Sequence, residues 1–139
     1  MNEIARVFAA GGGGLVLLGL SGLHVYWVCG GRWGADAAVP TAGTRPLFRP
    51  SRAGTSVVGV LLAGAGAVVL AEVSPWAGEF TKWGTRALGA VFALRALGEF
   101  KWVGFFKRVR GTKFAKLDTW LYSPLCAVMA AACLYLGWR

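Results

Sequence analysis

Three stretches of the chain contain no Lys, Arg, Asp or Glu and are long enough to cross a lipid bilayer. They run from Val7 to Cys29, from Ala53 to Ala71 and from Thr119 to Trp138. A transmembrane helix needs about 20 mostly apolar residues to cross a hydrocarbon core that is ~30 Å thick. Hydrophobic residues make up 56% of the chain and charged residues 15%, whereas an ordinary soluble domain has about 25% charged residues. The sequence therefore predicts an integral membrane protein whose single domain covers residues 1–139.

A fourth stretch, from Ala87 to Phe106, is apolar except for Arg95, Glu99 and Lys101. The segment between the first two spans is rich in arginine, and the segment after this fourth stretch is rich in lysine and arginine. Both basic segments lie on one side of the membrane only if the fourth stretch crosses it, and that side is then the cytoplasm. We therefore predict an all-α, four-transmembrane-helix bundle with both termini outside and two basic cytoplasmic loops. Its spans are expected near residues 7–29, 53–71, 87–106 and 119–138.

The first span is expected to remain as an uncleaved helix. Its apolar run is too long for the core of a signal peptide, and the positive charge follows the run rather than preceding it. A formal net charge of +9 also raises the question of nucleic acid. However, no recognition motif accompanies the charge, and the basic residues fall between the apolar spans. We expect anionic lipid at the cytoplasmic loops as a partner, and no nucleic acid.

The cysteines and the histidine of the chain do not indicate a metal site or a redox centre. The three cysteines form no CxxC pair, and the chain has one histidine, so a structural metal site and a thiol–disulfide exchange centre are disfavoured. A single histidine also rules out bis-histidine haem ligation within one protomer. The sequence predicts no metal ligands and leaves the cofactor unknown.

Arg95 and Glu99 are four residues apart, so on a continuous helix they share one face. An ionised residue near the centre of a transmembrane helix costs about 2.5–3.5 kcal/mol on insertion scales, so both side chains should face protein or water. Two interpretations stay open. The two residues form a structural ion pair, or one of them contacts a ligand or a proton.

His24 is expected in the cytoplasmic half of the first span, at a depth similar to that of Glu99. It is either a hydrogen-bonded structural group or a proton acceptor near neutral pH. We predict tentative acid–base residues at His24 and Glu99 and ligand contacts from the set Trp27, Arg32, Arg95 and Tyr122. Asp118 is expected to cap the helix that follows it.

Small residues recur every four positions along the second span, at Gly59, Ala63, Ala67 and Ala71. Such a stripe lets helices approach closely in lipid. It is expected to pack the bundle, with a homo-oligomer contact as the alternative.

Two stretches, "HVYWVCGGRWGADAAVP" and "LGEFKWVGFFKRVRGTKFAKLDTWLYSPLC", resemble a family of small bacterial four-helix membrane proteins classed as a domain of unknown function. The resemblance covers most of the chain and implies a multi-pass protein of the bacterial cytoplasmic membrane, without an activity. By its motifs it draws attention to His24, Trp27, Arg32, Trp33, Arg95, Glu99, Asp118 and Tyr122. The topology is also similar to that of membrane-associated eicosanoid and glutathione enzymes, but the polar helix 2 motif of those enzymes is absent here.

These sequence features are consistent with three classes of function. The first is a polar pocket in the cytoplasmic half of the bundle that binds an amphipathic small molecule or lipid, with or without acid–base chemistry. The second is a proton-coupled carrier that uses Glu99, although Arg95 beside it would favour the ionised carboxylate. The third is an accessory subunit of a larger membrane complex.

Overall fold

The computed structural model describes residues 2–138, in which four long helices and a short hairpin account for the regular structure. Polar side chains start two of the helices, because Asn2 accepts a hydrogen bond from the Ile4 amide and Ser51 accepts one from the Gly54 amide. The elements in chain order are α1 (Glu3–Val28), the 3-10 turn η1 (Ala35–Ala37), β1 (Thr41–Ala42), β2 (Arg45–Pro46), α2 (Arg52–Ala71), α3 (Glu79–Leu97), α4 (Lys113–Leu117), the π-helical turn η2 (Asp118–Tyr122) and α5 (Ser123–Gly137).

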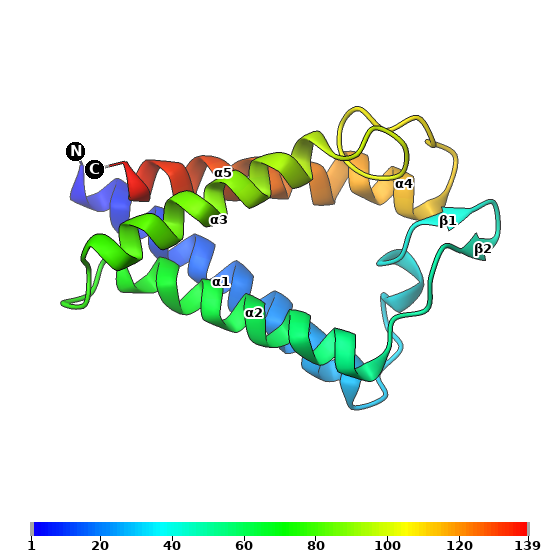
Figure 1. The fold of residues 1–139 in the computed structure, drawn as a ribbon, viewed down its shortest axis with the longest axis horizontal. Coiled ribbons are helices and arrows are strands. Elements are labelled where there is room, and N and C mark those ends of the chain that lie inside the picture. The colour runs from blue at the N-terminus through cyan, green and yellow to red at the C-terminus, as the bar shows by residue number, and fades with distance from the viewer. Residues whose placement is uncertain (1, 139) are drawn as a thin grey trace.

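The helices form two antiparallel pairs, α1 with α2 and α3 with α5 (Figure 1). The pairs lie close together at the end that holds the chain termini, and they diverge toward the opposite end. The two basic segments, residues 29–51 and 98–112, both lie at this opposite end, which we call the basic end. The fold therefore gathers both positively charged segments on one side of the molecule.

Three helical segments are long and apolar enough to span a membrane, which are Glu3–Val28, Arg52–Ala71 and Lys113–Gly137. Large apolar side chains point outward from all three segments, with Phe8 75%, Val60 72% and Val128 65% exposed. Exposed apolar faces of this extent suit contact with lipid rather than water. The chain is thus a small membrane protein, as the apolar stretches predict.

The third helix differs from the expected span at residues 87–106. It begins eight residues earlier than expected, at Glu79, and ends at Leu97 because Gly98 takes a φ of 81° and Phe100 a φ of 69°. These left-handed conformations turn the chain back over the end of the helix. Glu99 and Lys101 consequently lie in the 98–112 segment, outside the helix on which the sequence placed them.

Small residues allow α1 and α2 to pack closely against each other. A Cβ at Gly14 would collide with the Leu70 side chain, and a Cβ at Gly66 would lie 3.3 Å from the Gly14 carbonyl oxygen. Gly59 is buried under α1, where the Ser21 hydroxyl donates to its carbonyl oxygen at 2.7 Å. Of the small-residue stripe, Gly59 thus faces α1, whereas Ala67 is exposed. The shared core contains Ala10, Leu17, Val69, Met129, Cys133 and Leu136.

Candidate functional site

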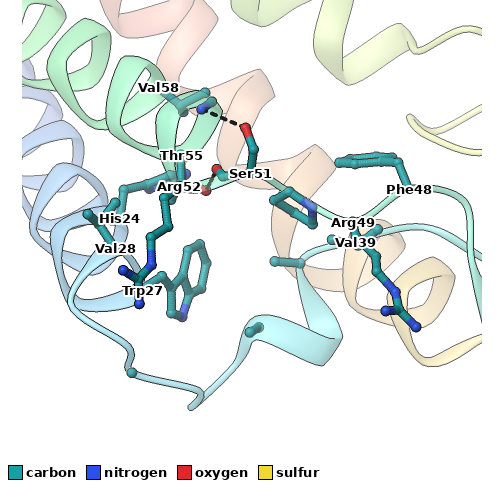
Figure 2. Close-up of a pocket in the computed structure, with 15 residues that line it drawn as sticks. His24, Trp27, Val28, Val39, Phe48, Arg49, Ser51, Arg52, Thr55 and Val58 are labelled. Carbon is teal, nitrogen blue, oxygen red and sulfur yellow. Dashed lines mark hydrogen bonds between the residues drawn. The ribbon is translucent and has the colours of Figure 1, made fainter.

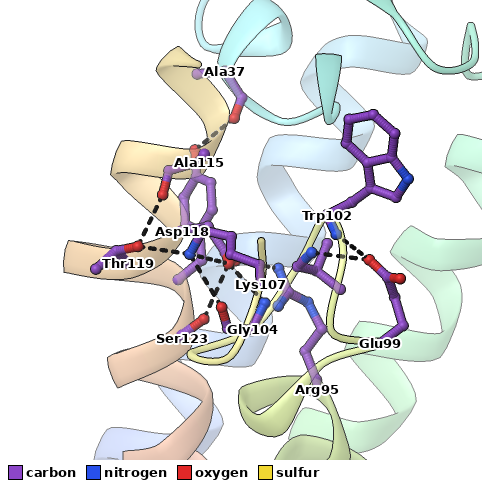
Figure 3. Close-up of polar contacts among 12 residues, drawn as sticks. Ala37, Arg95, Glu99, Trp102, Gly104, Lys107, Ala115, Asp118, Thr119 and Ser123 are labelled. Carbon is purple, nitrogen blue, oxygen red and sulfur yellow. Dashed lines mark hydrogen bonds and ion pairs between the residues drawn. The ribbon is translucent and has the colours of Figure 1, made fainter. Parts of the chain in front are cut away.

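A buried carboxylate, Asp118, organises the basic end of the α3–α5 pair (Figure 3). Its Oδ1 accepts a hydrogen bond from Arg95 Nη2 at 2.7 Å, and its Oδ2 lies 3.1 Å from Lys107 Nζ. Oδ2 also accepts from the Gly104 amide at 2.8 Å and from the Ser123 hydroxyl at 3.2 Å. Two cations and two neutral donors thus satisfy a single carboxylate that has no solvent exposure.

Lys107 is the cation that ties the 98–112 segment into this network. Its ammonium group donates to the Thr119 hydroxyl at 2.6 Å and to the Gly104 carbonyl oxygen at 3.1 Å, and its side chain is buried. A buried lysine is tolerated when its charge is paired and its three protons are hydrogen-bonded. These hydrogen bonds and the ion pair with Asp118 therefore hold the 98–112 segment against η2.

Glu99 has a different partner from the one that the i, i+4 spacing predicts. Its carboxylate accepts hydrogen bonds from the Trp102 amide and from the Val103 amide, the latter at 3.2 Å. The ion pair with Arg95, one of the two interpretations that the spacing left open, does not form, because the helix ends between the two residues and Arg95 turns to Asp118. Glu99 thus stabilises the turn that follows α3.

The predicted capping role of Asp118 is also wrong. The helical segment begins at Lys113, and its N-cap is Thr112, whose hydroxyl accepts from the Ala115 amide at 3.1 Å. Asp118 lies one turn further along, where its side chain points into the ion network.

A pocket of about 610 Å³ lies at the basic end, between the last turn of α1, the 29–51 segment and the first turns of α2. This volume is within the range of small-molecule sites, roughly 300–1,000 Å³. Figure 2 shows the side chains that surround it. The apolar part of the wall comes from Val28, Val39, Phe48 and Val58, with Trp27 beside them, and the polar part from His24, Arg49, Ser51, Arg52 and Thr55.

Hydrogen bonds orient the two α1 residues of the pocket. His24 Nδ1 lies 2.7 Å from the Leu20 carbonyl oxygen, which can only accept, so Nδ1 carries a proton and Nε2 remains for another partner. The Trp27 indole N–H donates to the Trp33 carbonyl oxygen at 2.9 Å. The two rings meet edge to face, with their centroids 5.0 Å apart. The backbone of the 29–51 segment thus positions the aromatic wall.

The pocket carries uncompensated positive charge. Within residues 2–138, neither Arg49 nor Arg52 forms an ion pair, and no carboxylate lines the pocket. Asp36, which follows the lining residue Ala35, binds Lys113 at 2.6 Å instead. That hydrogen bond is the main cause that holds the pKa of the Asp36 carboxyl below its usual value of 3.8. The pocket therefore suits an anionic group.

The structure divides the residues that the sequence singled out. His24 and Trp27 line the pocket, whereas Arg32 is exposed beside it. Arg95 belongs to the Asp118 network, and Glu99 to the turn after α3. The Tyr122 hydroxyl donates to the Ala37 carbonyl oxygen at 3.0 Å, which ties η2 to η1 beside the pocket.

Sequence reasoning missed the pocket residues Phe48, Arg49 and Arg52, and the buried Lys107. The position of Arg49 and Arg52 near the pocket could have been inferred from Ser51. Ser51 is a favoured N-cap residue directly before an apolar span, so its neighbours had to lie at the helix start, level with the end of α1. Nothing in the sequence marks Lys107 among the other basic residues of its segment.

The comparisons with known proteins place this architecture in one family. The model of a family described as "Protein of unknown function (DUF3995)" matches residues 17–133, which include α2, α3, the pocket, the second half of α1 and most of α5. Searches of curated proteins and of solved structures returned no match.

Proposed function

The chain belongs to this family of unknown function, and from its pocket we propose that it binds an amphipathic small molecule or lipid at the basic end of a four-span bundle. The family match confirms the resemblance noted in the sequence and supplies no activity. The assignment therefore depends on the site itself.

We propose that α3 crosses the membrane together with the three more apolar segments. It packs antiparallel along α5 over most of its length (Figure 1), so a membrane that contains α5 also contains α3. With four crossings, both basic segments lie on the same side, as they do in the fold. The positive-inside rule then assigns the basic end to the cytoplasm and both termini to the outside of a bacterial cytoplasmic membrane.

The binding proposal is based on the composition of the pocket and on its position in the fold. The first residue of α2, Arg52, lies on its wall, and so does Val58, which is about 9 Å deeper at 1.5 Å per residue. The two arginines of the wall thus lie at the membrane boundary, with apolar Val39 and Phe48 on the same segment, and the deeper wall pairs Val58 with His24, which packs beside Gly59. A ligand with one charged end and a largely apolar remainder fits a wall that carries its arginines only at the boundary.

The contacts of Glu99 favour binding over a proton-coupled carrier. Its carboxylate is used by two backbone amides of an adjacent turn, and His24 lies in a pocket that Glu99 does not line. Acid–base chemistry, if the pocket performs any, would therefore use His24 Nε2 without Glu99.

A matched pair of tryptophan substitutions tests the proposal. Val58 lines the pocket, and its neighbour Val57 is exposed outside it. Binding of 11-(dansylamino)undecanoic acid to the purified protein in maltoside detergent is measured by energy transfer from tryptophan, with each variant calibrated by its own titration. We expect saturable binding that Val58→Trp weakens at least about tenfold, a loss of ~1.4 kcal/mol, and that Val57→Trp leaves unchanged. Equal binding by both variants, or no saturable binding, would contradict the proposal.

A further inference from the structure

The 98–112 segment has a fixed conformation without a helix or strand of its own. Its Phe105 amide donates to the Ala96 carbonyl oxygen at 2.8 Å, so the chain folds back onto the last turn of α3. The buried Lys107 ammonium group then connects the segment to Asp118 at 3.1 Å. Side chains on this segment therefore have defined positions relative to the membrane helices.

These contacts set the depth of the segment in the membrane. From Gly137, the last residue of α5, to Asp118 the helical chain extends roughly 28 Å at 1.5 Å per residue. The hydrocarbon core of a bilayer is ~30 Å thick. When α5 crosses the core from its Gly137 end, Asp118 and the 98–112 segment reach the opposite boundary, at the level of the lipid headgroups. This depth follows from α5 alone and does not involve the ligand pocket.

At this level the segment exposes aromatic rings and cations together. Phe100 is 57% and Phe106 59% exposed, and their ring centroids lie 6.4 Å apart. Lys101 and Arg108 are exposed as well, and neither forms an ion pair within the part of the chain that the structure describes. The acidic residue of the segment, Glu99, is bound by two backbone amides of the same turn. We define the anchor surface as Phe100, Lys101, Phe106 and Arg108.

We infer that the anchor surface inserts into the headgroup layer of the membrane and selects anionic lipid. Its two rings lie at the boundary of the acyl chains, and its two cations bind lipid phosphates. Aromatic side chains bury apolar area in this layer, and basic side chains near it are attracted to anionic lipid. The anchor surface belongs to the α3–α5 pair and is separate from the ligand pocket.

Position and charge favour lipid over a protein partner. The anchor surface is fixed to the start of the apolar segment Lys113–Gly137, which is long enough to span the membrane, so lipid is its immediate neighbour. Each basic residue near an anionic leaflet strengthens the attraction about fivefold. An anionic leaflet therefore supplies both the apolar boundary for the rings and the negative charge that the cations lack.

A fluorophore in place of one ring tests where the anchor surface lies. Phe106→Cys, in a cysteine-free background, is labelled with nitrobenzoxadiazole and reconstituted into vesicles of phosphatidylcholine and phosphatidylglycerol. The matched control is Thr44→Cys, because Thr44 is exposed in the β1–β2 turn, which lies farther from the chain termini than the 98–112 segment (Figure 1). We expect lipids with a nitroxide near the headgroup to quench the fluorophore at position 106, and iodide in the water to quench the one at position 44. Quenching of both fluorophores by iodide, and of neither by the lipids, would overturn the inference and leave a surface available to a protein partner.

The same fluorophore at position 106 reports which lipid the anchor surface selects. The nitroxide is carried by phosphatidylglycerol or by phosphatidylcholine, in vesicles that contain both lipids in unchanged proportion. We expect phosphatidylglycerol to be enriched about fivefold at the fluorophore, and Lys101→Gln combined with Arg108→Gln to remove the enrichment. Arg45→Gln combined with Arg49→Gln removes as many charges from the 29–51 segment and should retain it. Equal quenching by the two lipids would overturn the selection of anionic lipid. Enrichment that survives the loss of Lys101 and Arg108 would overturn their assignment as the phosphate-binding residues.

Discussion

Lys107 Nζ lies 3.1 Å from Asp118 Oδ2, and both side chains are fully shielded from solvent. The contact joins the 98–112 segment to the start of the last membrane helix, across the end of α3. A buried ion pair of this kind adds little net stability relative to apolar residues, but loss of one partner leaves a charge buried without compensation. The position of the basic segment thus depends on Asp118.

Asp118→Asn should destabilise the protein strongly, because the substitution leaves Arg95 and Lys107 without their shared anion. The expected loss is about 3–5 kcal/mol, measured as a lower thermal unfolding midpoint in detergent. Asp36→Asn is the matched control, since it breaks the exposed pair with Lys113, and it should leave the midpoint unchanged. Similar midpoints for the two variants would show that the Asp118 network is not a stabilising cluster.

The Asp36–Lys113 pair should respond to acid. Its hydrogen bond lowers the pKa of Asp36 below 3.8, so the folded state binds that proton less readily than the unfolded state does. The contribution of the pair is therefore present above the ordinary value and is lost as the pH falls through the lowered pKa. We expect amide hydrogen exchange in residues 35–39, corrected for its intrinsic pH dependence, to increase only below pH 3.8. In Lys113→Gln it should already be faster at neutral pH. Exchange rates in residues 35–39 that are the same in Lys113→Gln and in the unsubstituted protein would contradict a stabilising Asp36–Lys113 contact.

Two glycines make the turn after α3 possible. Gly98 and Gly104 have φ values of 81° and 88°, and a Cβ on either would collide with backbone atoms, of Val103 and Leu97 respectively. The left-handed conformation alone costs about 1–2 kcal/mol for an L-residue, so alanine at either position should cost more than that. Gly111→Ala, in the same segment but in open space, is the control. Unfolding midpoints that are equal in all three variants would contradict the account of the turn.

Accessible cysteines test the number of crossings. In a cysteine-free background we expect Arg45→Cys and Gly111→Cys, which probe the two basic segments, to resist a membrane-impermeant maleimide on intact cells. Both should react after permeabilisation. Pro75→Cys, in the link between α2 and α3 at the opposite end, should react from outside. Labelling of Gly111→Cys but not Arg45→Cys on intact cells would mean that α3 does not cross.

Much of the helical framework could be predicted from hydropathy, and one helix could not. The run without charges from Ala53 to Ala71 nearly coincides with α2 (Arg52–Ala71). The apolar run from Ala87 to Phe106 instead misplaced α3, because hydropathy does not detect the break at Gly98. Lys82 and Arg86 lie in the part of α3 that the apolar run did not include, near the chain termini. Arg86 lies over the Trp83 ring and donates to the Gly137 carbonyl oxygen at 2.7 Å.

The site was less predictable, because its contacts join segments that are distant in the sequence. Arg95 lies 23 residues from its partner Asp118, and local spacing pointed to Glu99 instead. His24 was singled out as a rare ionisable residue in an apolar span. By residue type, its pocket neighbours Arg49 and Arg52 cannot be distinguished from the other basic residues between the spans. They line the pocket because the start of α2 packs beside the end of α1.

The position of a bound amphiphile tests the central claim most directly. An alkyl phosphate with a diazirine at the chain end, activated by light in isolated membranes, can be mapped by peptide mass spectrometry. We predict that the label concentrates on pocket residues such as Val28, Val39 and Val58 and that Val58→Trp removes it. Label spread over outward apolar side chains such as Phe8, Val60 and Val128, with no effect of Val58→Trp, would contradict a ligand site in this pocket.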